Sequence, residues 1–111
     1  MLFVLHCIDR PGDGAAIRRR TRAAHFQYLM AHQEQFHFGG PLLDERDGMI
    51  GSLMVLNLPD RAALDTFMRT EPYCASGLFA SISVHQTKQM FPEATPGALA
   101  AELAKQSAGA A

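Results

Sequence analysis

The chain has 111 residues, of which 48% are hydrophobic and 19% charged, so its length and apolar content predict one globular domain with its own core. Its 10 Lys and Arg residues nearly balance 11 Asp and Glu residues, which predicts no nucleic-acid partner and no binding to an anionic membrane. No apolar stretch approaches the roughly 20 residues of a membrane span, and the apolar start lacks the features of a signal peptide. We therefore expect a cytoplasmic protein.

The first half of the chain predicts a strand, a long helix and a hairpin. Residues 1–8 form a run that is apolar on both faces except at His6, which is typical of a central strand. Residues 15–33 contain no Gly or Pro and predict a helix. Residues 36–43 and 50–57 predict two strands joined by a turn at Asp47-Gly48. The first of these strands contains Gly39-Gly40-Pro41, which indicates an edge strand or a bulge.

The second half predicts a helix, a strand and a C-terminal extension. The helix should begin near Pro59-Asp60 and end at Glu71, because the residue before Pro72 is disfavoured in the helical region. Residues 73–78 predict a turn, and residues 79–90 predict the last strand. After Pro92 the composition becomes rich in Ala. We expect a domain over residues 1–91 and an extension over 92–111, with a helix over about 98–106 and disorder in the last residues.

The predicted order of elements, β-α-β-β-α-β with a hairpin in the middle, is that of an α+β ferredoxin-like sandwich. In this arrangement both helices cover one face of an antiparallel sheet, and the other face is open. The first strand would expose Leu2, Val4 and Ile8, or their alternates, on the open face. We therefore expect a homodimer in which two chains pair through their open sheet faces.

The last predicted strand alternates between apolar and polar residues. If Ala80, Ile82 and Val84 face the helices, the polar residues between them face the open side. In the usual strand order of this fold, the first strand lies between the last and the third strands. On this reasoning we expect a polar patch on the open face, formed by His6, Ser52, Ser81, Ser83 and His85.

Common motifs for metals, cofactors and nucleophilic catalysis do not occur. The five histidines form no HxH or HExxH pair, so we expect no metal site. Cys7 and Cys74 lie 67 positions apart and are expected to be buried free thiols. No GxGxxG, P-loop or GxSxG motif is present, which argues against common nucleotide-binding and serine-hydrolase sites. No cofactor is expected.

His25 is the best candidate for acid/base chemistry. On a helical wheel Ile17, Ala24 and Tyr28 share one buried arc, and His25 lies on its edge, where an imidazole can be partly desolvated and still reach a cleft. Glu71, at the helix end that Pro72 imposes, could orient the imidazole ring. The alternatives are a packed histidine without a role and a solvated carboxylate. The run Arg18, Arg19, Arg20 and Arg22 is interpreted as a solvated helix face, with a reservation for Arg22.

Several short motifs occur in a characteristic order: Arg22-Ala-Ala-His25 followed by Tyr28-Leu29, then Gly39-Gly40-Pro41-Leu42, Asp47-Gly48, Gly51-Ser52, Glu71-Pro72-Tyr73 and Ala75-Ser-Gly77-Leu78. Over residues 1–91 this combination resembles the YCII-related (YciI-like) family. The resemblance implies a dimeric α+β barrel of ferredoxin-like subunits and a histidine paired with an acid as the active pair.

Carried over by position, the active pair of the family corresponds to His25 and Glu71. The family usually has Asp before Pro-Tyr, so the extra methylene of Glu71 either alters the pair or leaves its role to another acid. The resemblance also indicates the residues expected to bind the substrate, which are Arg22, Gly40, Pro41, Ser52 and Tyr73.

Two functions are compatible with the sequence. One is a small enzyme without a cofactor, in which His25 acts as general acid/base on a small organic molecule. Relatives that degrade chlorinated aromatic compounds favour elimination or isomerisation. The alternative is a non-catalytic module that binds a small ligand or a protein, through the same cavity or through the arginine-rich helix.

Overall fold

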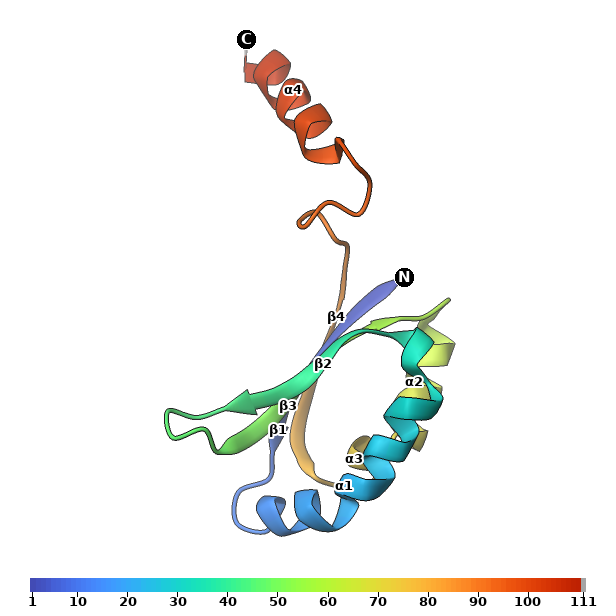
Figure 1. Ribbon diagram of the computed structural model, residues 1–111, viewed down its shortest axis with the longest axis vertical. Coiled ribbons are helices and arrows are strands. Elements are labelled where there is room, and N and C mark those ends of the chain that lie inside the picture. Colours follow the sequence, from blue (N-terminus) through green and yellow to red (C-terminus); the bar gives the residue numbers. More distant parts are fainter. Residues whose placement is uncertain (111) are drawn as a thin grey trace.

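The computed structural model describes residues 1–110. The elements follow the order β1 (Leu2–Asp9), α1 (Gly14–Ala31), the 3₁₀ turn η1 (Gln33–Gln35), β2 (Phe36–Leu43), β3 (Met49–Asn57), α2 (Arg61–Thr70), α3 (Pro72–Ala75), β4 (Phe79–Thr87) and α4 (Ala98–Ala110). The four strands form one antiparallel sheet in the order β2-β3-β1-β4. Helices α1, α2 and α3 cover one face of it (Figure 1). The predicted ferredoxin-like α+β fold is confirmed.

Helix α1 ends at Ala31, two residues before its predicted end, and three other differences from the prediction are larger. Residues 72–75 form the short helix α3 instead of part of a turn, because Glu71 caps its N-terminus and Pro72 occupies its first position. Strand β4 ends at Thr87 because β1, its pairing partner, starts at Leu2, opposite Thr87. Helix α4 extends to Ala110 and stands away from the sheet (Figure 1), and position 111 lies outside the described residues.

The core lies between the sheet and the helices. Alternate residues of β1, namely Phe3, Leu5 and Cys7, point towards the helices and are at most 3% exposed. They pack with residues from β3 and α2, the largest being Leu56, Leu64 and Phe67. The apolar first strand is thus a central strand, as its composition predicts. None of the described helices has the length and apolar character needed to cross a membrane.

The edge position of β2 follows from its sequence. Pro41 lacks the N–H that an interior strand must donate, and β2 pairs with β3 alone. The β2–β3 register runs without a shift through Gly39-Gly40-Pro41 and shifts only near the two ends of β2, so the edge position, and not a bulge at this segment, accommodates Pro41. The tight turn before β3 contains Asp47, whose φ of 61° is accepted more readily by Asp than by most residues.

The open face of the sheet is as predicted, except for Ser52. Leu2, Val4 and Ile8 alternate with the core residues of β1 and lie on this face. The register also places His6, Ser81, Ser83 and His85 there. Ser52, however, is directly opposite Cys7, and directly opposed residues share one face. Ser52 therefore points towards the helices, so its assignment to the open-face patch was wrong.

Helix α1 buries a different stripe from the one predicted. Its buried residues are Gly14, Ile17, Arg18 and His25, while Ala24 is exposed. The stripe is thus rotated towards His25, which lies within it and not on its edge. The apolar pattern alone missed this rotation because one member of the stripe, Arg18, is charged.

Candidate active site

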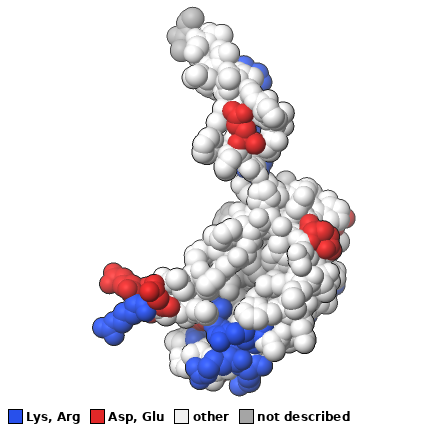
Figure 2. Space-filling view, viewed as in Figure 1, with Lys and Arg blue, Asp and Glu red and all other residues white. Residues whose placement is uncertain are grey.

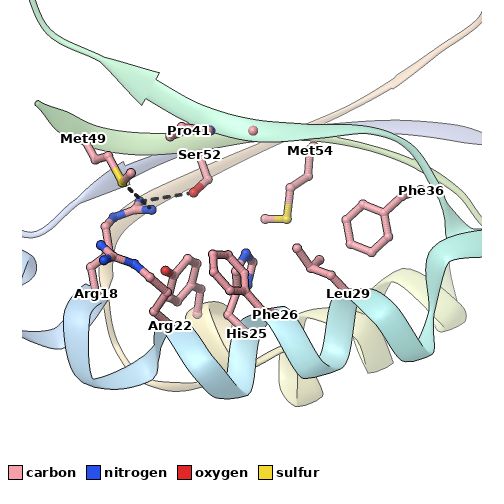
Figure 3. A pocket seen from close by; sticks show the side chains of 13 residues that line it. Arg18, Arg22, His25, Phe26, Leu29, Phe36, Pro41, Met49, Ser52 and Met54 are labelled. Atoms are coloured by element: carbon pink, nitrogen blue, oxygen red, sulfur yellow. Dashed lines mark hydrogen bonds between the residues drawn. The ribbon is translucent and has the colours of Figure 1, made fainter. Parts of the chain in front are cut away.

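A pocket of about 230 Å³ lies between α1 and the helix-facing side of the sheet (Figure 3). Its volume is smaller than the roughly 300–1,000 Å³ of typical ligand sites, so it suits a small molecule. Its wall is mostly apolar, with aromatic rings and thioethers among the lining side chains. The lining residues are Arg18, Arg22, His25, Phe26, Leu29, Phe36, Gly39, Gly40, Pro41, Met49, Ser52, Met54 and Tyr73.

His25 is held from behind by Glu71. The Nδ1 atom of His25 and the Oε1 atom of Glu71 form a short hydrogen bond between α1 and the start of α3. The other carboxylate oxygen, Oε2, accepts the backbone N–H of Cys74 at 2.9 Å. One buried carboxylate therefore caps α3 and orients the imidazole. The extra methylene of Glu71 does not prevent the pair from forming.

The sequence Glu71-Pro72-Tyr73 places two groups beside His25. Pro72 keeps Glu71 in an extended conformation (φ −65°, ψ 126°), which ends α2 and turns the carboxylate towards α1. Two residues later, the Tyr73 ring stacks on the imidazole with centroids 3.7 Å apart and planes 12° apart. The imidazole is thus fixed by a hydrogen bond at its edge and by an aromatic ring at its face.

Glu71 is fully buried, and its electrostatic surroundings favour the ionised form. Burial alone would raise the pKa of this carboxyl, but the hydrogen bonds from His25 and from the Cys74 N–H outweigh burial and lower the pKa below its usual value. Glu71 is therefore an anion at neutral pH. An anion at Nδ1 favours the tautomer that carries its proton on Nδ1 and stabilises the imidazolium when Nε2 accepts a second proton.

The remaining ring nitrogen of His25, Nε2, is available to the pocket. Nε2 has no hydrogen-bond partner among residues 1–110. In this part of the chain, every side-chain nitrogen or oxygen that is fully buried does have a partner. Nε2 must therefore have access to solvent, and His25 lines the pocket. This is the arrangement that a general base requires: one nitrogen oriented and one nitrogen open.

The interpretation of the arginine run as a solvated face was wrong for Arg18. Arg18 is only 5% exposed, because its guanidinium forms a two-point ion pair with Asp9 at the end of β1, with both N–O distances at 2.8 Å. It also lies over the ring of Tyr73, 4.9 Å from the centroid. Burial by itself lowers the pKa of Arg18, but the Asp9 carboxylate outweighs it, so the net shift is upward. Arg19 and Arg20 are exposed, as expected.

The pocket carries positive charge. Two arginines line it, and no lining residue is acidic. Arg22 is half-buried and forms no ion pair with another described residue. Arginine side chains gather over the first half of α1, next to the hollow between helix and sheet (Figure 2). The pocket therefore favours a ligand with negative charge or strong acceptor oxygens.

The structure brings all the predicted site residues together. Arg22, Gly40, Pro41, Ser52 and Tyr73 line the pocket with His25, and Glu71 lies directly behind the imidazole. Sequence reasoning missed Arg18, although its spacing of four from Arg22 and seven from His25 puts all three on one side of α1. It also missed the apolar wall, where Met49 and Met54 come from β3 and Phe26 from α1.

Comparison with known proteins gives a family and a structural relative. A sequence model of the YCII-related domain matches residues 1–88. A similar solved structure is 5-chloro-2-hydroxyhydroquinone dehydrochlorinase from Burkholderia phenoliruptrix AC1100, in complex with 2,5-dihydroxybenzoquinone. It is 32% identical, with a TM-score of 0.72, and the match covers 80% of this chain and 95% of that chain. No curated protein matches. The relative is thus a small-molecule enzyme with the same fold.

Proposed function

We propose that this chain, which belongs to the YCII-related domain family, is an enzyme that uses His25 as general acid/base on a small organic molecule. The observation that carries the proposal is the buried, ionised Glu71 at Nδ1 of His25, combined with an Nε2 atom that faces the pocket. Such a pair costs stability to bury, and it places a proton acceptor beside a small cavity.

Proton transfer at Nε2 is the step that the pocket supports best. His25 Nε2 takes a proton from a hydroxyl or an acidic carbon of the substrate. The resulting imidazolium is stabilised by Glu71, whose carboxylate stays ionised. The proton can then be returned to another atom of the same molecule. Arg22, Gly40, Pro41, Ser52 and Tyr73 hold the substrate against the imidazole in this proposal.

Elimination is the reaction class that we propose, because the structural relative is a dehydrochlorinase. For a dihydroxylated ring that bears a leaving group X, loss of HX gives a quinone without an oxidant. One hydroxyl proton moves through His25 to the carbon that bears X. Removal of the second hydroxyl proton then breaks the C–X bond, X leaves with the electron pair, and two C=O bonds replace two C–OH groups. Isomerisation would use the first half of this sequence.

The experiment measures turnover of 5-chloro-2-hydroxyhydroquinone through the amount of chloride that is released. His25→Ala should abolish turnover. The change also removes the partner of the buried Glu71 carboxylate and so lowers stability, and turnover is therefore measured at a temperature at which circular dichroism shows the variant to be folded. His32→Ala is the matched control, because His32 caps the C-terminus of the same helix, lies outside the pocket, and bonds the backbone carbonyl of Tyr28. Normal turnover by His25→Ala would refute the catalytic assignment.

A non-catalytic binding role through the arginine-rich surface remains the second candidate, because Arg19 and Arg20 are exposed beside the pocket-lining Arg22. Arg18 cannot belong to such a surface, since it is buried against Asp9. The test is therefore Arg19→Ala/Arg20→Ala. Loss of turnover in this double variant would count against a separation of the two roles.

We also propose that the chain acts as a cytoplasmic homodimer paired through the open sheet face. Helices cover only one side of the sheet, and Leu2, Val4 and Ile8 leave the other side apolar (Figure 1). Val4→Asp should shift the mass measured by light scattering from dimer to monomer, whereas Gln27→Asp, on the exposed side of α1, should not. A monomeric mass for the wild type at micromolar concentration would contradict the proposal.

A further inference from the structure

The pocket is charged at one end and apolar at the other. The guanidinium of Arg18 lies at the charged end, and His25 lies near the middle (Figure 3). Beyond His25, the wall is formed by the side chains of Leu29, Phe36 and Met54, which we call the apolar end. These three side chains carry no hydrogen-bond donor, and the thioether is their one acceptor, a weak one. They offer no partner for a polar group of a ligand.

The apolar end has a fixed shape because its side chains pack against the core. Met54 is only 2% exposed and belongs to the core between sheet and helices. The ring of Phe36 packs edge-on against the ring of Phe67, with centroids 5.7 Å apart and planes 65° apart. Leu29 follows His25 by one turn of α1, so both lie on the same side of the helix. A ligand group at this end is thus removed from water by preformed apolar surfaces.

Gly39 leaves open space at the apolar end. It is directly opposite Met54 in the β2–β3 register, so a side chain at position 39 would point towards the helices. A Cβ built on Gly39 would have only the Phe36 ring within 4 Å, with its nearest carbons at 3.4 and 3.7 Å. Its φ is not positive, so the backbone does not require glycine. The missing side chain therefore serves the space in the pocket and not the path of the chain.

The pocket is larger than a single ring needs. A cavity of about 150 Å³ can hold benzene, whereas this pocket has a volume of about 230 Å³. A water molecule takes about 30 Å³ in the liquid, so the remaining ~80 Å³ is room for about three groups of similar size. A ring that reaches His25 with a hydroxyl group thus leaves part of the pocket unfilled.

We infer that the substrate is a hydroxylated ring with an apolar substituent of about three heavy atoms, alkyl or halogenated, and that this substituent binds in the apolar end beside Gly39. This inference rests on the proposed function, since the ring hydroxyl that faces His25 fixes the direction of the substituent. Leu29, Phe36 and Met54 then determine which substituted rings are accepted. They act on specificity through shape and through the absence of polar partners.

The first experiment compares three uncharged probes by isothermal titration calorimetry with the full chain, under exclusion of oxygen. Propylhydroquinone should bind about tenfold or more tightly than hydroquinone, because its three added carbons leave water. The (2-hydroxyethyl)hydroquinone probe has the same number of heavy atoms, but its hydroxyl finds no partner, so its gain over hydroquinone should stay below about threefold. Equal affinities of the propyl and hydroxyethyl probes would overturn the inference.

The second experiment fills the space beside Gly39. Gly39→Ala should reduce the affinity for propylhydroquinone by about fivefold or more, because the new methyl group occupies the place of the substituent. Affinity for hydroquinone should remain within about threefold of the wild type. Gly109→Ala is the matched control, because it adds the same methyl group in α4, where there is open space. Undiminished affinity for propylhydroquinone in Gly39→Ala would overturn the inference.

The third experiment changes the chemistry of the apolar end. Leu29→Asn introduces an amide of nearly the same size, which can pair with a ligand hydroxyl, so the preference for the propyl over the hydroxyethyl probe should fall by about tenfold. Met30→Asn is the control, because Met30 is 65% exposed and does not line the pocket. An unchanged preference in Leu29→Asn would count against the inference. If this variant does not fold, Gly39→Ala and the wild-type comparison decide.

The two proposals can fail separately. If the propyl gain depends on Gly39 and Leu29 but His25→Ala retains turnover, the proposed function is wrong and the apolar subsite stands. If turnover requires His25 but the propyl gain is absent or ignores both changes, the inference about the substituent alone is wrong.

Discussion

Replacing His25 by Phe should destabilise the fold by leaving a buried charge without its partner. Phe retains a planar ring to stack on Tyr73, so the change mainly removes the Nδ1–H donor. Glu71 is 0% exposed and would keep only the backbone N–H of Cys74. Removing one member of a buried ion pair costs about 3–5 kcal/mol, and the retained backbone bond favours the lower end, about 3 kcal/mol at pH 7.

The pH dependence of this loss has a definite sign. In the wild type the pKa of Glu71 is lowered, because its hydrogen bonds outweigh burial, so its contribution to stability is present at neutral pH and lost as pH falls through the folded pKa. In His25→Phe, burial acts without the imidazole and raises the pKa of Glu71. Its contribution is then lost as pH rises. The difference in free energy of unfolding between the two proteins should therefore shrink by about half or more from pH 7 to pH 5.

Urea denaturation followed by far-UV circular dichroism at both pH values measures this difference. His25→Phe/Glu71→Gln is the matched control, because it removes the buried charge as well. It should be more stable at pH 7 than His25→Phe by about 1–2 kcal/mol. The reasoning is refuted if His25→Phe loses the same free energy at pH 5 and pH 7, or if the double variant is less stable than the single one.

Three further predictions concern the fold. Gly51→Ala should lower the free energy of unfolding by about 3 kcal/mol or more in urea titrations. The added Cβ would lie 2.1 Å from the Cys7 carbonyl oxygen and would push β3 away from β1. Gly109→Ala is the control and should cost nothing, because there is open space around its Cβ. Burial raises the pKa of the Cys7 thiol from 9.0 to about 12, so stability should fall as pH rises from 9 towards 12, and Cys7→Ala should flatten that slope in thermal melts. Removal of residues 92–111 should change the melting temperature by less than about 3 °C, since α4 stands away from the sheet; a larger loss would show that the extension supports the domain.

Local features of the sequence were sufficient for much of the architecture. Pro72 ends one helix whatever surrounds it, Asp47-Gly48 turns the hairpin, and Pro41 restricts its strand to an edge, because each effect depends on the backbone within a few residues. The candidate pair His25 and Glu71 also followed from the sequence, through the order of short motifs. The structure then showed that Glu71 reaches the imidazole.

Other features depended on residues that are distant in the sequence. Arg18 is buried because Asp9 neutralises it across a loop, and a charged residue carries no apolar signal for the helix face it occupies. Ser52 faces the helices because β3 pairs with β1 in one register, and a shift of one residue would reverse it. The sequence by itself thus determined the elements and a candidate base. Only the tertiary structure decided which cation joins that base in the pocket, since the ion pair and the strand register form only when the chain is folded.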